Sequence, residues 1–484
     1  MYKLLISILF VNRLVSIYCV CFVKLFNEKL SMKLFEDLKL KFESASWGRH
    51  TEFAVIDTIL EKHSDIFLLF KDDIMGKSSG SQFGRGDVPS VEQIVRAAIY
   101  KEMKGMDYRE LADAQDDSRI CAYFIKLDQR KPYSFQMFQN YISRIKPETL
   151  QKVLYRINQI AIGEGYEDVQ QVCQDTTVVK SNIHYPTNNS LVWDCIKECD
   201  RLFGHLQKEV TDLKYIDYTK GAKKTYFKLN VTKKEEARLE LFCIQLIRFT
   251  KVINQLSNVV KKNFGNLKAG LIQIQMASLL DLMYQVYEMA FELQIEGNKV
   301  PNEKKLFSIY ELHSDIIVKG QREVEFGHKV SLATGSSNLI LDCQVLKGNP
   351  GDKTLYQGVI NRVVKAYGIV PRDSAADGGY ATLENLKFAK GINIKNIVFN
   401  KVVGSLQNHV SSKNMETRLK KWRSSIEAGI SNLKRGFNLE RCNWKGWEHF
   451  QAKVMWSALG YNFRVLTAMV MKSILREQSL AKAA

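Results

Sequence analysis

The chain has 484 residues, enough for about two to four domains with substantial cores. Its apolar content of 45% and charged content of 25% are those of a globular protein, which excludes wholesale disorder. The net charge of +18 favours partners that present phosphate or another anionic surface. The nine cysteines form no paired CxxC arrays, so we expect no structural zinc site and a reducing cytoplasmic location.

Residues 1–31 form an apolar extension that resembles a signal peptide or a membrane anchor in composition. Arg13 and Lys24 interrupt the apolar run, and no small-residue cleavage site follows it. A central arginine costs about 2.5–3.5 kcal/mol in a membrane-spanning helix, so we expect no membrane partner. We interpret the segment as the product of a mis-assigned upstream start; a membrane-associated protein is the alternative that it alone motivates.

Residues 32–160 have the pattern of an all-α domain. IDTILEKHSDIFLLF and VEQIVRAAIYKEM place apolar residues at helical spacing, a Gly/Ser-rich loop separates them, and Ser134 is a candidate N-cap. Short helices joined by tight turns suit a helix-turn-helix-like DNA-binding domain. A small bundle that only packs on its neighbour has the same pattern, and both interpretations stay open.

Residues 161–189 change to strand character, and residues 190–300 return to helix. VQQVCQDTTVV predicts a short strand that Asp175 ends. In residues 201–270, Lys and Arg outnumber Asp and Glu by 15 to 6 and alternate with aromatic residues. This basic helical insertion, with Lys223 and Lys224, could clamp DNA. A solvated helical hairpin is the alternative interpretation.

Residues 301–470 predict an α/β unit. FGHKVSLATG and LILDCQVLKG form an expected hairpin, followed by a helix, a strand that ends near Asp377, a helix and a further strand. A basic loop, KNMETRLKKWR, leads into the last helix and supplies Lys420 and Lys421 as DNA contacts. With residues 161–189 this order predicts a mixed sheet interrupted by the insertion, and residues 471–484 are expected to be a C-terminal tail.

Three acidic residues in this framework suit a phosphodiester-cleaving centre. Asp175 and Asp377 follow apolar strand runs, and Glu427 lies on an amphipathic helix. Cleavage needs an activated water or 3′-hydroxyl and a stabilised leaving oxygen, which two metal ions can provide. Carboxylates are the ligands that Mg²⁺ prefers, so we expect these three residues to hold two Mg²⁺ or Mn²⁺ ions.

Other aspartates compete for the same role, namely Asp315, Asp342 and Asp373. Asp377 is preferred because Gly378 and Gly379 follow it and allow close approach of the backbone to a metal. Asp175 is preferred because it closes an apolar strand and is followed by Thr176 and Thr177. Strands buried on both faces rarely tolerate an unpaired carboxylate, so we expect this aspartate at a strand end with a partner or a metal.

The last helix carries cations beside its acid. Ile426, Ile430, Leu433 and Phe437 define its expected buried stripe. Lys434 follows Glu427 by seven residues and shares its face, and Arg423 precedes it by four. These cations could contact DNA phosphate beside the metal, although Arg423 is also the ordinary i, i+4 partner of a glutamate on a solvated helix.

His184 and His328 lie near the predicted strands. Either could assist proton transfer, but such a histidine is more often a structural hydrogen-bonding residue.

Four blocks in order resemble bacterial DDE insertion-sequence transposases. QDTTVVKSNIHYPTNNSLVWD resembles the first-aspartate block, VEFGHKVSL the second-strand block and ADGGYAT the second-aspartate block. Arg423, Glu427 and Lys434 resemble the glutamate signature. The blocks cover about residues 90–470, and the ISNCY-like group is the most similar. Asn188 stands where the family pattern has an aspartate.

The resemblance implies a catalytic domain of the RNase H-like fold and DNA transposition as the activity. Asp175, Asp377 and Glu427 would be the metal ligands, and Lys434 would contact DNA near the cut. Each transposon end would be nicked, and its free 3′-hydroxyl would then attack target DNA. The expected partners are double-stranded DNA and at least one further copy of the chain, in the bacterial nucleoid. A catalytically inactive DNA-binding relic is the alternative.

Overall fold

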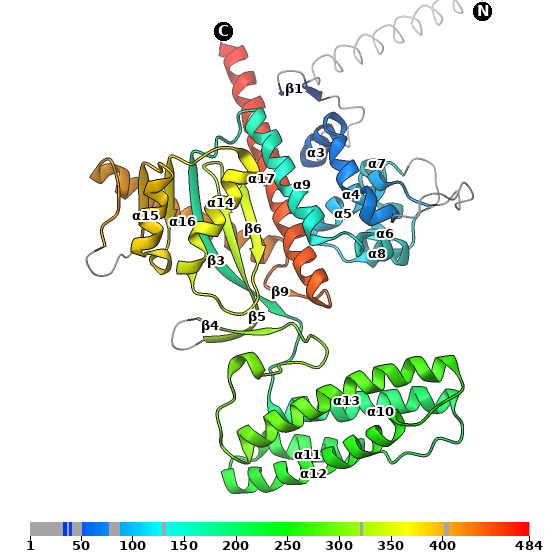
Figure 1. Ribbon diagram of the computed structural model, residues 1–484. Coiled ribbons are helices and arrows are strands. Elements are labelled where there is room, and N and C mark those ends of the chain that lie inside the picture. Colours follow the sequence, from blue (N-terminus) through cyan, green and yellow to red (C-terminus); the bar gives the residue numbers. More distant parts are fainter. Residues whose placement is uncertain are drawn as a thin grey trace, which may run out of the picture.

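The computed structural model describes residues 32–35, 38–40, 51–76, 88–127, 132–319, 323–400 and 406–483. The apolar extension at 1–31 and most of the Gly/Ser-rich loop therefore lie outside the described residues. The chain forms a helical N-terminal part, an α/β part and a separate group of helices (Figure 1). In the sequence, this group comes between the first two long strands of the α/β part.

The N-terminal part consists mainly of short helices. They are α3 (Thr51–Lys62), α4 (Asp65–Met75), α5 (Val91–Lys104), α6 (Tyr108–Asp117), α7 (Arg119–Phe124), α8 (Phe135–Ile142) and α9 (Pro147–Gly163). Ser134 caps α8 by accepting a hydrogen bond from the backbone N–H of Met137, as its position in the sequence predicts. The helical prediction fails at the start of the segment, where β1 (Met32–Phe35) and β2 (Leu38–Leu40) pair antiparallel.

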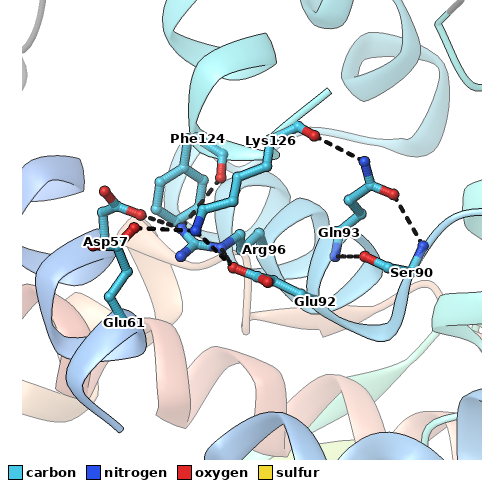
Figure 2. A network of polar contacts seen from close by, with 8 residues as sticks. All are labelled: Asp57, Glu61, Ser90, Glu92, Gln93, Arg96, Phe124 and Lys126. Atoms are coloured by element: carbon cyan, nitrogen blue, oxygen red, sulfur yellow. Dashed lines mark hydrogen bonds and ion pairs between the residues drawn. The ribbon is translucent and has the colours of Figure 1, made fainter. Parts of the chain in front are cut away.

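A buried arginine joins three of these helices. Arg96 of α5 is fully buried; it pairs with Asp57 of α3 and, at 2.8 Å, with Glu92 (Figure 2). Its guanidinium also donates to the carbonyl oxygen of Phe124 at 3.3 Å and lies 5.4 Å from the centre of that ring. Burial raises the pKa of Asp57 while Arg96 opposes the shift, so the carboxylate relies on this partner.

We expect Arg96→Ala to lower the free energy of unfolding by about 3 kcal/mol, because it leaves Asp57 without its buried partner and opens a cavity. Chemical denaturation would measure the loss. Lys71→Ala, which removes an exposed cation from α4, is the control and should change stability little. An Arg96 variant as stable as this control would contradict a structural role for the ion pair.

The α/β part is built on a mixed sheet of seven strands within the described residues. They are β3 (Gln171–Ser181), β4 (Asp315–Lys319), β5 (Glu323–Thr334), β6 (Ile340–Val345), β7 (Asp373–Ala376), β8 (Asn396–Phe399) and β9 (Arg441–Cys442). The main order is β4-β5-β3-β7-β8; β6 pairs with β5 and β9 with β3. β5 runs antiparallel to β3, whereas β7 and β8 run parallel to it and to each other. The mixed α/β sheet confirms the sequence expectation and is consistent with an RNase H-like transposase domain, while β4 and β9 were not predicted.

Two layers of helices cover the sheet. α14 (Tyr356–Tyr367) and α15 (Leu383–Gly391) share a core with Val172 of β3 and Ala376 of β7. α16 (Lys413–Gly436) and α17 (Trp447–Ala483) share another with Cys173 and Ala375, the neighbouring residues on the same strands. Since successive residues of a strand point to opposite faces, this alternation assigns each strand residue to one layer.

α17 also carries the N-terminal part, because one continuous core extends from α3, α5 and α9 onto it. The helix continues through residues 471–483, which were expected to be a tail. Likewise, the expected basic loop KNMETRLKKWR is the first half of α16, whose start is capped by Ser412. Glycine and proline are absent from both segments, so nothing in them ends a helix.

The chain between β3 and β4 forms four helices with a core of their own. They are α10 (Asn188–Glu209), α11 (Thr219–Val231), α12 (Glu235–Val260) and α13 (Leu267–Gln294). Thr187 begins the group as the N-cap of α10, in a reciprocal pair of hydrogen bonds with Ser190. Figure 1 shows these helices side by side, away from the sheet, with α11 and α12 on the side farther from it.

Candidate active site

Asp175 and Asp377 lie on adjacent strands and share one face of the sheet. β3 pairs with β7 up to Gln174 opposite Ala376, so each aspartate is the next residue beyond the last pair. Both follow a residue of the α16 layer by two positions, Cys173 and Ala375 respectively, and so point towards α16. The sheet thereby brings together two residues that are 202 positions apart in the sequence, since 377 − 175 = 202.

The prediction that Asp175 ends its strand is wrong. β3 continues to Ser181 and pairs with β5 along its length, with Asp175 opposite Leu332. On the side of β7, however, the pairing stops one residue before Asp175. The residue is therefore in the middle of β3 but at an edge of the parallel part of the sheet, which leaves space for a carboxylate. Asp377, in contrast, directly follows β7 as expected.

α16 lies across these two strands and presents the third acid. Leu419, Ile426 and Leu433 recur every seven residues and are buried, which fixes the rotation of the helix. Glu427 follows Ile426 and therefore lies at the rim of this contact, with its side chain 58% exposed. The Sγ of Cys173 donates to the carbonyl oxygen of Arg423 at 3.8 Å, which joins the helix to β3 next to Asp175.

Arg423 connects the acids. Its Nη1 is 3.0 Å from Oδ1 of Asp377, and its Nη2 contacts Oε1 of Glu427. The guanidinium is almost fully buried, with its side chain 8% exposed. One cationic group thus lies between two of the three predicted acids, from different elements, and brings their carboxylates to the same place.

Asp175 has a perturbed carboxyl group. Burial raises its pKa to about 6, and the charges of Asp377 and Glu427 act in the same direction. The backbone N–H of Thr176 and the guanidinium of Arg423 oppose this shift. The mutual influence of the three acids in this balance shows that they form one electrostatic unit. A raised carboxyl pKa beside like charges is typical of a functional centre.

The rival aspartates have structural partners. Asp342 is buried and accepts hydrogen bonds from Arg362 and Tyr155. Asp373 is buried between Arg372 and Asn396. Asp315 lies 3.2 Å from His328 and accepts from the backbone N–H of Gly348 at 2.6 Å. Their charges are therefore already satisfied.

A further acid, Asp352, approaches the centre and had no signal in the sequence. Its Oδ1 accepts from Thr176 at 3.2 Å and pairs with Lys329 at 2.7 Å. A Cβ on residue 379 would lie 2.9 Å from Oδ2 of Asp352. A larger residue than Gly379 would therefore have to push the Asp352 side chain aside. The contacts join Asp352 to two strands that are far from it in the chain, so no local pattern could reveal them.

Tyr380 also lies among these acids. It is fully buried, its hydroxyl has no hydrogen-bond partner among the described residues, and Asp352, Asp175 and Asp377 are among the groups that raise its pKa further. Its hydroxyl is therefore a candidate hydrogen-bond donor beside the acids.

The donor set fits a hard divalent cation. All three predicted ligands are carboxylates, which suit Mg²⁺ or Mn²⁺. In the part of the chain that the structure describes, no three His, Cys, Asp or Glu side chains are grouped closely enough to hold a metal ion. The guanidinium of Arg423 lies between two of the acids, so we expect cation binding to require its displacement.

The remaining predicted cations pair with other acids or are exposed to solvent. Lys434 is 3.6 Å from Glu440, Lys420 pairs with Glu416 at 2.7 Å, and Lys421 is exposed on the same helix. Lys223 and Lys224 are exposed on α11, in the helical insertion. The structure therefore assigns them to two surfaces, one along α16 and one on the insertion.

Neither predicted histidine contacts the acids. His328 is buried on β5; its Nε2 is 2.8 Å from Nδ1 of His313, and it lies opposite Val179. His184 is half exposed and lies 3.4 Å from Asp194 at the start of the insertion. Both positions are those of structural histidines.

Residues 317–463 match the family model of the transposase DDE domain. The matched range includes Asp377, Arg423 and Glu427 and begins after the insertion that follows Asp175. Comparison with curated proteins and with solved structures gave no match. No helix among the described residues has the length and apolar character needed to cross a membrane. The family match supports a transposase that processes DNA.

Proposed function

We propose that the chain is a DDE transposase of the ISNCY-like group. It would cleave the ends of its mobile element and join the free 3′-hydroxyl groups to target DNA. Asp175, Asp377 and Glu427 would hold two divalent cations. The observation that carries this proposal is the meeting of Asp377 and Glu427 on one guanidinium beside the perturbed Asp175.

The residues of the chain have separate tasks in this reaction. Bound divalent cations would activate the attacking water or 3′-hydroxyl and stabilise the leaving oxygen. Asp175 and Asp377 give rigid placement because they extend from paired strands. Glu427 is on a helix and half exposed, so it can adjust when DNA arrives. Arg423 neutralises the acids before cations bind and can then turn to a phosphate, which its planar guanidinium suits.

DNA would lie along two basic surfaces. Lys434, Lys420 and Lys421 follow Glu427 or precede it on α16 and would contact phosphates near the cut. Lys223 and Lys224 would hold DNA farther away, on α11. At least two copies of the chain are needed in the active assembly, since two element ends must be joined.

Cleavage of end-bearing DNA tests the proposal. The purified chain would be incubated with the sequences that flank its gene, which should contain inverted repeats bounded by short direct repeats. We expect cuts at the repeat ends with Mg²⁺ or Mn²⁺ and none in chelator or with scrambled ends. Binding without cleavage under every metal condition would instead support the inactive relic.

Replacing both Lys223 and Lys224 by alanine is expected to weaken DNA binding. Each phosphate contact contributes about −0.9 to the slope of log affinity against log salt, so the slope should become shallower by about 2. Fluorescence anisotropy over a salt series would measure it. Lys387→Ala with Lys390→Ala removes the same charge from exposed positions on α15 and serves as the control. Equal effects of the two double variants would contradict a specific clamp.

A further inference from the structure

A cavity lies where the N-terminal helices meet the link between α16 and α17. Its volume is about 550 Å³. The end of α5, the start of α6 and one side of α8 line it, together with residues of the link at 438–445 and the first turns of α17. Lys101, Gln139, Asn443, Lys445 and His449 contribute nitrogen donors to its wall. None of these residues belongs to the acid centre, which is the group formed by Asp175, Asp377 and Glu427.

Lys101 is the unusual member of this wall. The residue is only 6% exposed, and its Nζ lies 5.0 Å from the centre of the Tyr108 ring and 5.5 Å from that of Trp444. No hydrogen-bond acceptor or carboxylate partner for this ammonium is found among the described residues. The Nζ is not among the enclosed side-chain atoms that lack a partner; Lys101 lines the cavity, so its three N–H donors face a space where a bound group can accept from them.

Three acids, Glu102, Asp107 and Glu110, line the same cavity as Lys101, and each of them has another partner. Glu102 pairs with Lys453 and accepts from Ser457 at 2.9 Å. Asp107 caps α6 by accepting from the backbone N–H of Arg109 at 2.7 Å, and Glu110 accepts from the backbone N–H of Asp107 at 2.7 Å.

The protonation balance of Lys101 agrees with this lack of a direct partner. Burial lowers the pKa of Lys101 and Lys453 acts in the same direction, whereas the three acids oppose the shift only from a distance. An anion brought into the cavity would satisfy the ammonium and restore its pKa.

We propose that this cavity binds a phosphate group of the DNA backbone, with Lys101 as its anchoring cation. A phosphate presents several acceptor oxygens to a lysine held as a point charge, and Lys445 and His449, which line the same cavity, can donate to the same group. The two aromatic rings fix the position of the ammonium. The identity of the phosphate as DNA rests on the proposed function, whereas the anion site itself follows from Lys101 and the cavity.

The site would link DNA to two parts of the chain at once. Lys101 is on α5 of the N-terminal part, and Lys445 is in the link that follows the Glu427 helix. A phosphate between them would therefore bridge the N-terminal helices and the segment next to the acid centre.

Lys101→Met is the first test. Methionine can pack between the two aromatic rings and removes an unpaired buried charge, so thermal stability should stay equal or rise. The slope of log DNA affinity against log salt should become shallower by about 0.9. Lys104→Met, an exposed position on the same helix, is the matched control. A salt slope equal to that of the control would overturn the proposal.

Protection of the lysine in the wild-type chain provides a test without any variant. Amine acetylation would be followed at Lys101 by mass spectrometry, with no anion, with millimolar inorganic phosphate, and with end-bearing DNA. We expect DNA to slow the reaction at Lys101 at least tenfold. Protection by inorganic phosphate but not by bound DNA, or equal rates in all three arms while DNA is bound, would overturn the DNA site and leave the transposase proposal intact. Absence of any DNA binding by the chain would overturn both.

Discussion

Replacing Asp175 or Asp377 by asparagine, or Glu427 by glutamine, is expected to lower the rate of metal-dependent end cleavage by roughly 10³-fold or more. Each change keeps the size of the side chain but removes one anionic ligand from a centre whose catalytic power is electrostatic. DNA affinity should persist, because the basic surfaces are on other residues. Single-turnover cleavage of labelled end DNA, with anisotropy as the measure of binding, would separate the two effects.

The rival aspartates supply the controls for this experiment. Asp315→Asn changes a carboxylate that pairs with His328 and lies outside the acid centre, so its cleavage rate should stay near that of the wild type. Cleavage that survives in any one of the three acid variants would remove that residue from the centre. Equal losses in the Asp315 variant would indicate a folding defect instead.

Asp175→Asn is also expected to stabilise the cation-free chain at neutral pH, by up to about 3 kcal/mol. The pKa of Asp175 is about 6 in the folded chain, against an ordinary value of 3.8. Between these values the folded chain holds a proton that the unfolded chain has lost. The contribution of Asp175 to the free energy of unfolding therefore falls as pH rises from about 4 to about 6. Above about pH 6 the carboxylate is charged in the folded chain and destabilises it fully. The variant carries no such charge.

Chemical denaturation in chelator at pH 4 and at pH 7.5 would measure this effect. We expect the variant to exceed the wild type at pH 7.5 and the difference to shrink towards pH 4. Asp342→Asn is the contrasting control: that carboxylate is paired with Arg362, so its loss should destabilise the chain. A destabilised Asp175 variant at pH 7.5 would contradict a strained acid centre.

The sequence was informative wherever local pattern decides structure. The hairpin of β5 and β6, the two helices α14 and α15, and the helical insertion all follow from apolar spacing and turn residues. Asp377 could be placed at a strand end because two glycines follow it. The prediction of a basic loop before Glu427 is wrong because a high density of charge does not by itself end a helix, and this segment of α16 contains no glycine or proline.

Contacts between distant segments could not be derived in this way. The position of Asp175 at an edge depends on β7 pairing with β3 only as far as Gln174, while β5 pairs with it as far as Lys180, which is a property of three strands together. The approach of Asp352 to Thr176 joins segments 176 residues apart. The buried position of Lys101 requires contact between Tyr108 and Trp444, which are far apart in the sequence. Tertiary packing alone creates these arrangements.

Arg423 combines a contact that its local spacing predicts with a contact that only the tertiary structure creates. Its spacing of four residues before Glu427 predicts an ordinary pair on one helix face. The structure adds Asp377 as a second partner of the same guanidinium and buries the group. A residue that could have been a surface cation is thus the contact through which the acids of the sheet and of the helix meet.

Anomalous diffraction from crystals soaked in Mn²⁺ tests the central claim most directly. The account predicts Mn²⁺ peaks bounded by Asp175, Asp377 and Glu427, with the guanidinium of Arg423 moved away from at least one carboxylate. The Asp175→Asn crystal should lose or weaken them under the same soak. Well-ordered wild-type crystals in which Mn²⁺ binds elsewhere, with all three acids still directed at Arg423, would contradict a shared cation centre.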